Sequence, residues 1–360
     1  MGLAEPRKDR QEEAQKNLEL PDGLIFHDHR ELLDKCRDID AAIVATDPTT
    51  HRQVACDCME RGLAIFLEKP MADTIENARE IADVAARTES LVQVGFNMRY
   101  APFYEKLHEI VRSGTLGKVL SINWTEAPSV RMWVEDYCRS PSYNRRAVIG
   151  SWLLEKSCHD IDQFNWLLGN SCVRVSSFGS RRYFVHRDDV PEHCTEGCPI
   201  SSECLYYAEK QEARARLRPE ESDICVYRCG SDLVDRQATI FEYADGTVVN
   251  FNLLPVDGGR FMHISGTEAT LYGRDAANEI EIHSMRTGEK TVHRIDTASD
   301  GHGGADMRMP DAFFNYLDDP SQTPETTAKE GFEAVLMCVA ADISMRELRV
   351  VELDSLRSRH

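Results

Sequence analysis

The alternation of short apolar runs with helical segments in the first hundred residues constrains the fold of this chain most strongly. Three runs are almost entirely apolar, and the stretches that separate them repeat apolar residues with a helical period. The apolar runs are 41–45, 63–67 and 91–95. Strands that are apolar on both faces belong to parallel sheets with helices packed on each side. We therefore expect a parallel α/β sheet in a first domain, residues 1–117.

The pattern changes beyond residue 117. Segments with strand character and turn residues between them dominate, and Asp245-Gly246 is a strong hairpin signal. One helix is expected early in this region and another near its end, at 328–348. We expect a second domain, 118–360, built on an open, mainly antiparallel sheet with a cysteine-rich insert at 193–229. Strands such as 247–254 carry apolar residues on both faces, which predicts a homodimer or homotetramer.

Composition excludes several classes of partner. A chain of 360 residues fits two domains, and a formal net charge of -19 argues against binding nucleic acid or an anionic membrane. No apolar run approaches the roughly 20 residues of a membrane span, and no signal peptide opens the chain. We expect a cytoplasmic protein whose thiols stay reduced.

Polar residues follow the expected parallel strands at the point where each strand ends. In open parallel sheets, ligands bind at the carboxyl ends of the strands. The polar residues in these positions are Thr46, Asp47, His51, Glu68, Lys69, Asn97, Arg99 and Tyr100. Ordinary loop polarity is the alternative interpretation.

A second cluster lies on the helix expected near residue 160. Glu155 and His159 are four residues apart and share a face, which Asp162 extends, and Lys156 lies beside them. A carboxylate next to an imidazole can fix its tautomer and pass a proton. The alternative is a solvated helix face with no chemical role.

Four segments together resemble the Gfo/Idh/MocA oxidoreductases. They are AIVATDPTTHRQVACDCMERGLAIFLEKPMA, VQVGFNMRYAPFYEKLHEIVRSGTLGKV, EKSCHDID and GHGGADMRMPDAFF. The resemblance implies a Rossmann-type nucleotide-binding domain followed by an open antiparallel sheet domain. It also implies reversible oxidation of a sugar or cyclic polyol hydroxyl with NAD or NADP. The alternative is a catalytically silent binding or regulatory protein that has kept the substrate domain.

The resemblance also implies a role for each motif residue. His159 would be the general base or acid, Lys69 would steer the substrate hydroxyl, and Glu155 would be the partner of His159. Cofactor contacts would come from Glu5, Arg7, Thr46, Asp47, His51, Glu68, Lys69 and Asn97, and substrate contacts from Arg99, Tyr100, Lys156 and Asp162. Pro70 would form a tight turn through a cis peptide bond. Trp152 and Tyr143 are candidates for stacking on a sugar.

The chain departs from the family pattern where relatives hold the cofactor phosphates. No Gly-x-Gly-x-x-Gly occurs in it, and its first residues resemble the end of the second strand of the family. Glu5 matches the position that binds the adenosine ribose, whereas Arg7 suits a 2'-phosphate, so NAD and NADP both stay open. We expect a truncated chain that binds the cofactor weakly.

The insert holds five cysteines in a loop-rich, proline-containing segment. They are Cys194, Cys198, Cys204, Cys225 and Cys229. Such a cluster predicts a structural zinc site, although the C-x3-C spacing differs from the commoner C-x2-C. Disulfides and packed free thiols are the alternatives.

Overall fold

The computed structural model describes residues 1–140, 143–208, 222–298, 302–319 and 321–358. These residues form two compact units. Unit 1 comprises Met1–Ala72, Glu76–Gly95 and Pro310–Phe332, and unit 2 comprises Asp73–Ile75, Phe96–Met309 and Glu333–His360. Domain limits at residues 117 and 118 stay a prediction.

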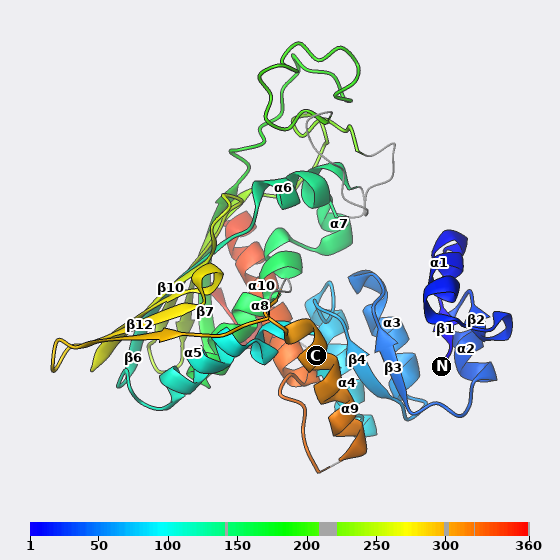
Figure 1. Cartoon of the computed structure of the whole chain (residues 1–360), viewed down its shortest axis with the longest axis horizontal. Helices are drawn as coiled ribbons and strands as arrows, with labels where there is room; N and C mark the ends of the chain where they lie inside the picture. Colours follow the sequence, from blue (N-terminus) through cyan, green and yellow to red (C-terminus); the bar gives the residue numbers. More distant parts are fainter. Residues whose placement is uncertain (141–142, 209–221, 299–301, 320, 359–360) are drawn as a thin grey trace. The chain divides into compact units, whose positions relative to one another are not determined.

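Unit 1 contains parallel strands connected by helices, as the apolar runs predicted (Figure 1). Strands β3 (Ala41–Val44), β4 (Ala64–Leu67) and β5 (Val92–Val94) form one parallel sheet, and β1 (Leu3–Ala4) pairs in parallel with β2 (Ile25–Phe26). The helices are α1 (Lys8–Leu18), α2 (His29–Lys35), α3 (Pro48–Met59) and α4 (Ile75–Thr88). A short 3-10 turn, η1 (Asp22–Leu24), precedes β2.

The register of the three-stranded sheet determines which residues lie side by side at the carboxyl ends of its strands. Val44 lies opposite Leu67, and Leu67 opposite Val94, so the three strands end at the same edge. Ile65, Leu67 and Val94 have no solvent exposure, because helices pack against the sheet. Phe66 meets Phe313 of α9 (Ala305–Asp318) edge to face at 5.6 Å between ring centroids.

Unit 2 is built on a nine-stranded sheet, in the order β13-β12-β11-β10-β6-β9-β8-β7-β14. All neighbours are antiparallel except β6 and β9, so the expected open, mainly antiparallel sheet is confirmed. The strands are β6 (Val119–Ala127), β7 (Cys172–Ser180), β8 (Arg236–Tyr243), β9 (Val248–Leu253), β10 (Gly259–Gly266), β11 (Ala269–Arg274), β12 (Glu279–Ser284), β13 (Lys290–Arg294) and β14 (Val351–Glu352). The predicted Asp245-Gly246 turn connects β8 to β9.

Helices α8 (Trp152–Leu168) and α10 (Ala328–Glu347) lie on one side of this sheet (Figure 1). Side chains along β8 alternate strictly between buried and exposed positions, as expected of a sheet covered on one face. The uncovered face carries large apolar side chains. They are Leu120, Phe178, Ile240, Phe261, Tyr272 and Val292.

Unit 2 also contains several shorter elements. They are η2 (Asn97–Tyr100), α5 (Pro102–Arg112), α6 (Val130–Met132), the π-helix η3 (Trp133–Arg139), α7 (Arg146–Ile149), η6 (Asp275–Ala277) and α11 (Asp354–Arg357). Among the described residues, no helix is long and apolar enough to span a membrane.

Candidate active site

Helix α8 is buried almost all round, with one half-buried stripe in its first three turns. From Trp152 to Phe164, every residue is buried except Glu155, Lys156 and His159. These three lie at i, i+1 and i+4, so they share one face of the helix. The predicted cluster therefore places a carboxylate, an ammonium and an imidazole together on the only part of this helix segment that solvent reaches.

The start of α8 is fixed by its N-cap. The Ser151 hydroxyl oxygen accepts a hydrogen bond from the backbone N–H of Leu154 at 3.1 Å. Gly150 precedes it with φ at +73°, and a side chain at this position would come within 3.2 Å of the Asp73 carbonyl oxygen. Glycine, which has no side chain and readily adopts a positive φ, is therefore required at position 150, immediately before the N-cap residue.

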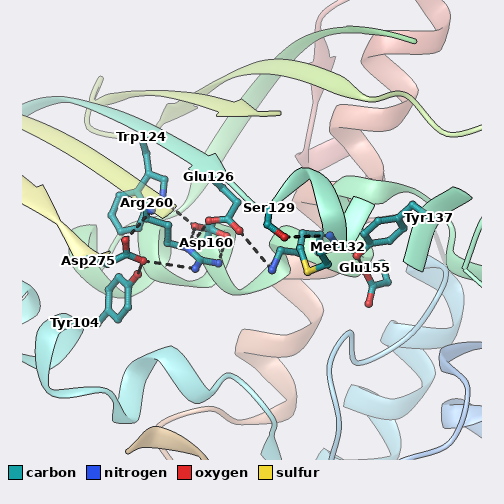
Figure 2. A network of polar contacts seen from close by, with 11 residues as sticks. Tyr104, Trp124, Glu126, Ser129, Met132, Tyr137, Glu155, Asp160, Arg260 and Asp275 are labelled. Atoms are coloured by element: carbon teal, nitrogen blue, oxygen red, sulfur yellow. Dashed lines mark hydrogen bonds and ion pairs between the residues drawn. The ribbon is translucent and has the colours of Figure 1, made fainter. Parts of the chain in front are cut away.

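Behind the stripe lies a buried network of charges that connects α8 to the sheet (Figure 2). The Lys156 Nζ is 3.4 Å from Glu126 Oε1 of β6, and the other Glu126 oxygen is 3.0 Å from Arg260 Nε of β10. Arg260 also donates to both oxygens of Asp160, at 2.7 and 3.1 Å. Lys156 thus forms the half-exposed end of a network that is otherwise buried.

Aromatic residues complete the network. Asp160 accepts a hydrogen bond from Trp124 Nε1 at 2.8 Å, and Asp275 accepts one from the Tyr104 hydroxyl at 3.0 Å. Asp275 also accepts from the backbone N–H of Arg260 at 2.7 Å. Three carboxylates and two cations share this region, so one negative charge is not matched by a cation within the network.

The electrostatics of the network follow from this imbalance. Burial raises the pKa of Glu126, Asp160 raises it further, and Arg260 and Lys156 act in the opposite direction. Burial alone would lower the pKa of Arg260, but Asp160 and Glu126 together raise it well above the usual range. Arg260 therefore stays charged and is the cation that makes burial of the carboxylates tolerable.

Glu155 has a partner from a different element. The Tyr137 hydroxyl of η3 donates a short hydrogen bond to Glu155 (Figure 2). Burial is the main cause that raises the pKa of Tyr137 well above its usual range, and the Glu155 charge adds to it. The phenol therefore remains protonated and holds Glu155 in place.

Two residues with a predicted substrate role form an ion pair with each other. Arg99 of η2 donates to both oxygens of Asp162, at 2.6 and 2.7 Å, and the two side chains are 5% and 1% exposed. This buried bidentate pair connects η2 to α8. Their substrate contact stays a prediction. Tyr100 is also buried.

Asn97 is likewise engaged within unit 2. Its Nδ2 donates to Asp306 Oδ1 at 2.9 Å, and the other Asp306 oxygen is 2.7 Å from His302 Nδ1. Burial would raise the pKa of Asp306, but the hydrogen bonds from His302 and Asn97 lower it. Its predicted cofactor contact stays a prediction.

In unit 1, the predicted polar residues do gather at one strand edge. Thr46 and Asp47 follow β3, whereas Glu68 and Lys69 follow β4. The Lys69-Pro70 peptide bond is cis, as expected. Asp47 is the N-cap residue of α3 but makes no side-chain cap bond. An ammonium, a hydroxyl and a helix N-terminus at one edge are donors that suit the phosphates and ribose hydroxyls of a dinucleotide.

His51 is buried between the segments that follow β3 and β4. It has no solvent exposure, and its ring nitrogens lie 2.8 Å from the Thr46 carbonyl oxygen and 3.1 Å from the Pro70 carbonyl oxygen. Burial lowers the pKa of His51 despite these hydrogen bonds, which favours the neutral ring. His51 therefore connects the two segments next to the turn at Lys69, and its predicted cofactor contact stays a prediction.

Glu5 and Arg7 follow β1 at the position expected from the resemblance. Glu5 accepts the backbone N–H of Arg7 at 2.8 Å, and the Arg7 guanidinium donates to Asp9. Because Arg7 is engaged by a neighbouring carboxylate, its availability for a 2'-phosphate stays a prediction.

The zinc prediction is not supported. Over the described residues, no group of three or more His, Cys, Asp or Glu side chains could hold a metal ion. Cys194, Cys198 and Cys225 of the insert are instead buried with Val190 in one apolar cluster. Packing of free thiols, one of the alternatives, agrees with this arrangement.

Sequence reasoning missed the network behind Lys156. Its members come from β6, β10, α5, α8 and η6 and are far apart along the chain. Asp160 lies in the same motif as His159, but the sequence analysis assigned it no role. A charged residue at a core position predicts a buried partner but does not indicate which residue supplies it.

Comparisons with known proteins agree with this fold. Residues 1–96 match the oxidoreductase family with an NAD-binding Rossmann fold, and residues 104–272 match the C-terminal domain of GFO/IDH/MocA proteins. YteT of Bacillus subtilis (strain 168) is 25% identical over 321 residues, which is 76% of this chain and 72% of YteT. Inositol 2-dehydrogenase 2 of Saccharopolyspora erythraea is 30% identical over 156 residues, 43% of this chain and 42% of that protein.

A solved structure shows the same architecture. Levoglucosan dehydrogenase, in complex with NADH and levoglucosan, superposes with a TM-score of 0.75 at 19% identity and covers 97% of this chain and 89% of that one. The fold and the matches define an oxidoreductase with an NAD-binding Rossmann domain and a mainly antiparallel sheet domain. The chain belongs to the Gfo/Idh/MocA family.

Proposed function

We propose that this protein transfers a hydride between NAD or NADP and a CH–OH group of a sugar or cyclic polyol. The observation that carries the proposal is the half-buried stripe of Glu155, Lys156 and His159 on an otherwise buried helix segment. Oxidation of a carbinol requires a group that accepts the hydroxyl proton and a charge that favours the alkoxide, and this stripe offers both.

His159 is the proposed general base. Its imidazole accepts the hydroxyl proton in the oxidation and returns it in the reduction. Glu155, one turn earlier on the same face, stabilises the imidazolium that forms. The hydrogen bond from Tyr137 keeps the Glu155 carboxylate oriented for this task.

Lys156 and Lys69 provide positive charge. The Lys156 ammonium favours the alkoxide form of the substrate, and its ion pair with Glu126 limits where the ammonium can go. Lys69, at the end of β4, steers a substrate hydroxyl and contacts the cofactor. Bound NAD or NADP supplies the hydride acceptor or donor, held by Thr46, Asp47, Glu68 and Glu5.

A polyhydroxylated ring is the proposed substrate class. An inositol dehydrogenase and a levoglucosan dehydrogenase are among the relatives, and both names refer to ring compounds with several hydroxyl groups. The half-buried Lys156 ammonium can donate hydrogen bonds to hydroxyls of such a ring, and the Glu155 carboxylate can accept them from neighbouring hydroxyls.

The test is cofactor-dependent oxidation of a panel of inositols and pyranoses. Cofactor affinity is measured first by titration, so that turnover is assayed near saturation. His159→Ala and Lys69→Ala should each reduce turnover by roughly two to four decades, as expected for an acid–base or steering group. His186→Ala, at an exposed histidine between β7 and the cysteine-rich insert, is the matched control and should keep normal turnover. Absence of turnover with every polyol and both cofactors would refute the proposal.

A further inference from the structure

An imidazole–carboxylate pair outside the proposed catalytic stripe lies at the start of α9. The His302 Nδ1 is 2.7 Å from Asp306 Oδ2, and the other Asp306 oxygen accepts a hydrogen bond from Asn97 Nδ2 at 2.9 Å. Asn97 is 8% exposed, whereas the side chains of His302 and Asp306 are 56% and 50% exposed. The pair therefore has a buried side, where Asn97 holds the carboxylate, and a side that solvent reaches.

Further contacts fix the start of α9 against η2 and α5. The Arg308 guanidinium donates to the Tyr100 carbonyl oxygen at 2.7 Å and to both carboxylate oxygens of Glu105, at 2.7 and 2.9 Å. Gly304, with φ at +93°, lies in the turn between His302 and Asp306, and glycine adopts such a conformation readily. These contacts hold the first turn of α9, and with it the Asp306 carboxylate, in a defined place.

The pair is connected to the surroundings of His159. Phe96, the residue before Asn97, meets the His159 ring at 6.2 Å between ring centroids, with the ring planes at 67°. All these residues belong to unit 2. The bond from Asn97 to Asp306 therefore places His302 on the same part of the molecule as the proposed general base.

The contacts of the pair determine which nitrogen of His302 is available to a ligand. Burial would raise the pKa of Asp306, but the hydrogen bonds from His302 and Asn97 lower it, so this carboxyl is ionised at neutral pH. A carboxylate beside Nδ1 favours the tautomer that carries its proton there, which leaves a lone pair on Nε2. None of the described residues forms a hydrogen bond with Nε2 of His302.

We propose that His302 is a specificity-determining residue, whose Nε2 accepts a hydrogen bond from a substrate hydroxyl that is not oxidised. This inference rests on the proposed function, because it adds a second contact to the same polyol. A polyhydroxylated ring presents several similar carbinols, so a contact away from His159 is needed to select the one that reacts. Asp306 and Asn97 are positioning residues that act through His302.

Two amide variants distinguish this role from a merely structural one. His302→Asn places its amide near the position of Nδ1, so it can keep the bond to Asp306 but offers no acceptor near Nε2. His302→Gln reaches the position of Nε2 and offers an amide oxygen there. A substrate contact predicts that the Gln variant binds substrate better than the Asn variant, whereas a role in holding Asp306 alone predicts the reverse.

The experiment titrates the full chain calorimetrically with the panel of inositols and pyranoses and measures KM and kcat for those that react. In His302→Ala and His302→Asn, Kd and KM should rise about three- to tenfold with little change in kcat, because this hydrogen bond is made equally before and during the reaction. His302→Gln should stay closer to the unsubstituted chain. His186→Ala is the matched control, since His186 is similarly exposed and lies 3.0 Å from a carboxylate of Asp188, and it should bind normally.

Deoxy analogues of the bound polyol identify the hydroxyl concerned. Removing that hydroxyl should weaken binding to the unsubstituted chain about three- to tenfold and leave binding to His302→Ala unchanged. Equal affinities of His302→Ala and the unsubstituted chain, or better binding by the Asn variant than by the Gln variant, would overturn the inference. Polyol binding that depends on His302 without any turnover would refute the proposed hydride transfer alone, and binding of no polyol would refute both.

Discussion

Glu126 is the residue at which the cost of burying charge is clearest. It is 2% exposed and faces Arg260 at 3.0 Å and Lys156 at 3.4 Å, yet burial and the nearby Asp160 dominate and raise its pKa. A carboxyl whose pKa is higher in the folded state binds its proton more tightly there. The ionised form therefore lowers the free energy of unfolding, and this cost grows as the pH rises above about 4.3, the value for an unperturbed Glu.

We predict that Glu126→Gln is at least as stable as the unsubstituted protein at neutral pH, because the amide removes the charge and keeps the shape. The difference in unfolding free energy should shrink as the pH falls toward about 4.3, where Glu126 is protonated in both states. Urea denaturation of both proteins across this range measures the difference.

The contrasting variant is Arg260→Met. It leaves Glu126, Asp160 and Asp275 without their shared cation and should cost about 3–5 kcal/mol of unfolding free energy. If Glu126→Gln destabilised the protein more than Arg260→Met, the ionised Glu126 carboxylate would stabilise the fold. That result would contradict its raised pKa, which implies that the charge lowers stability.

At the scale of single elements, the precise start of α8 decides where the proposed catalytic stripe points. The Ser151 cap and the positive φ of Gly150 begin the helix at Trp152, so Glu155, Lys156 and His159 fall on the uncovered side. A helix that began one residue later would still bury its core residues, but the first turn would fray and Glu155 would lose its fixed distance from Tyr137.

We predict that Ser151→Ala lowers the unfolding free energy by about 1 kcal/mol, because one N–H of the first turn loses its acceptor in a buried position. Ser151→Asp keeps an acceptor and is the matched control. Urea denaturation compares the three proteins, and equal stability of Ser151→Ala and the unsubstituted chain would show that the cap contributes nothing.

At the scale of the whole molecule, the uncovered sheet face predicts self-association. The prediction assumed apolar residues on both faces of 247–254, but half-buried Asn250 and exposed Asn252 alternate there with buried Phe251. The large apolar residues of this face come from other strands, among them Phe178 of β7 and Ile240 of β8, at 66% and 47% exposure. An apolar surface of this kind commonly binds a second copy.

The expected result is a dimer or larger homo-oligomer at micromolar concentration, measured by light scattering. Phe178→Glu combined with Ile240→Glu should dissociate it, because two buried, unpaired carboxylates would be too costly at an interface. Tyr183→Glu, an exposed aromatic position outside the strands, is the control and should leave the mass unchanged. A stable monomer of the unsubstituted chain would contradict the prediction.

The sequence by itself determined what depends on local period and on short motifs. The apolar runs predicted β3, β4 and β5, and the spacing of Glu155 and His159 put them on one helix face, because these features involve residues within one or two turns or along one strand. The Lys69-Pro70 segment and the helix motif at His159 were also sufficient to indicate the family, which the comparisons confirm.

Only the tertiary structure decided how polar groups are paired. His51 and Asp162 looked like ligand contacts, and both proved to be buried and engaged by other parts of the chain. The same holds for Arg260 and Asp160, which pair although they lie far apart in the sequence. A side chain's sequence neighbours determine its direction on a helix or strand, but its partner depends on which elements pack together, and that is a property of the folded chain.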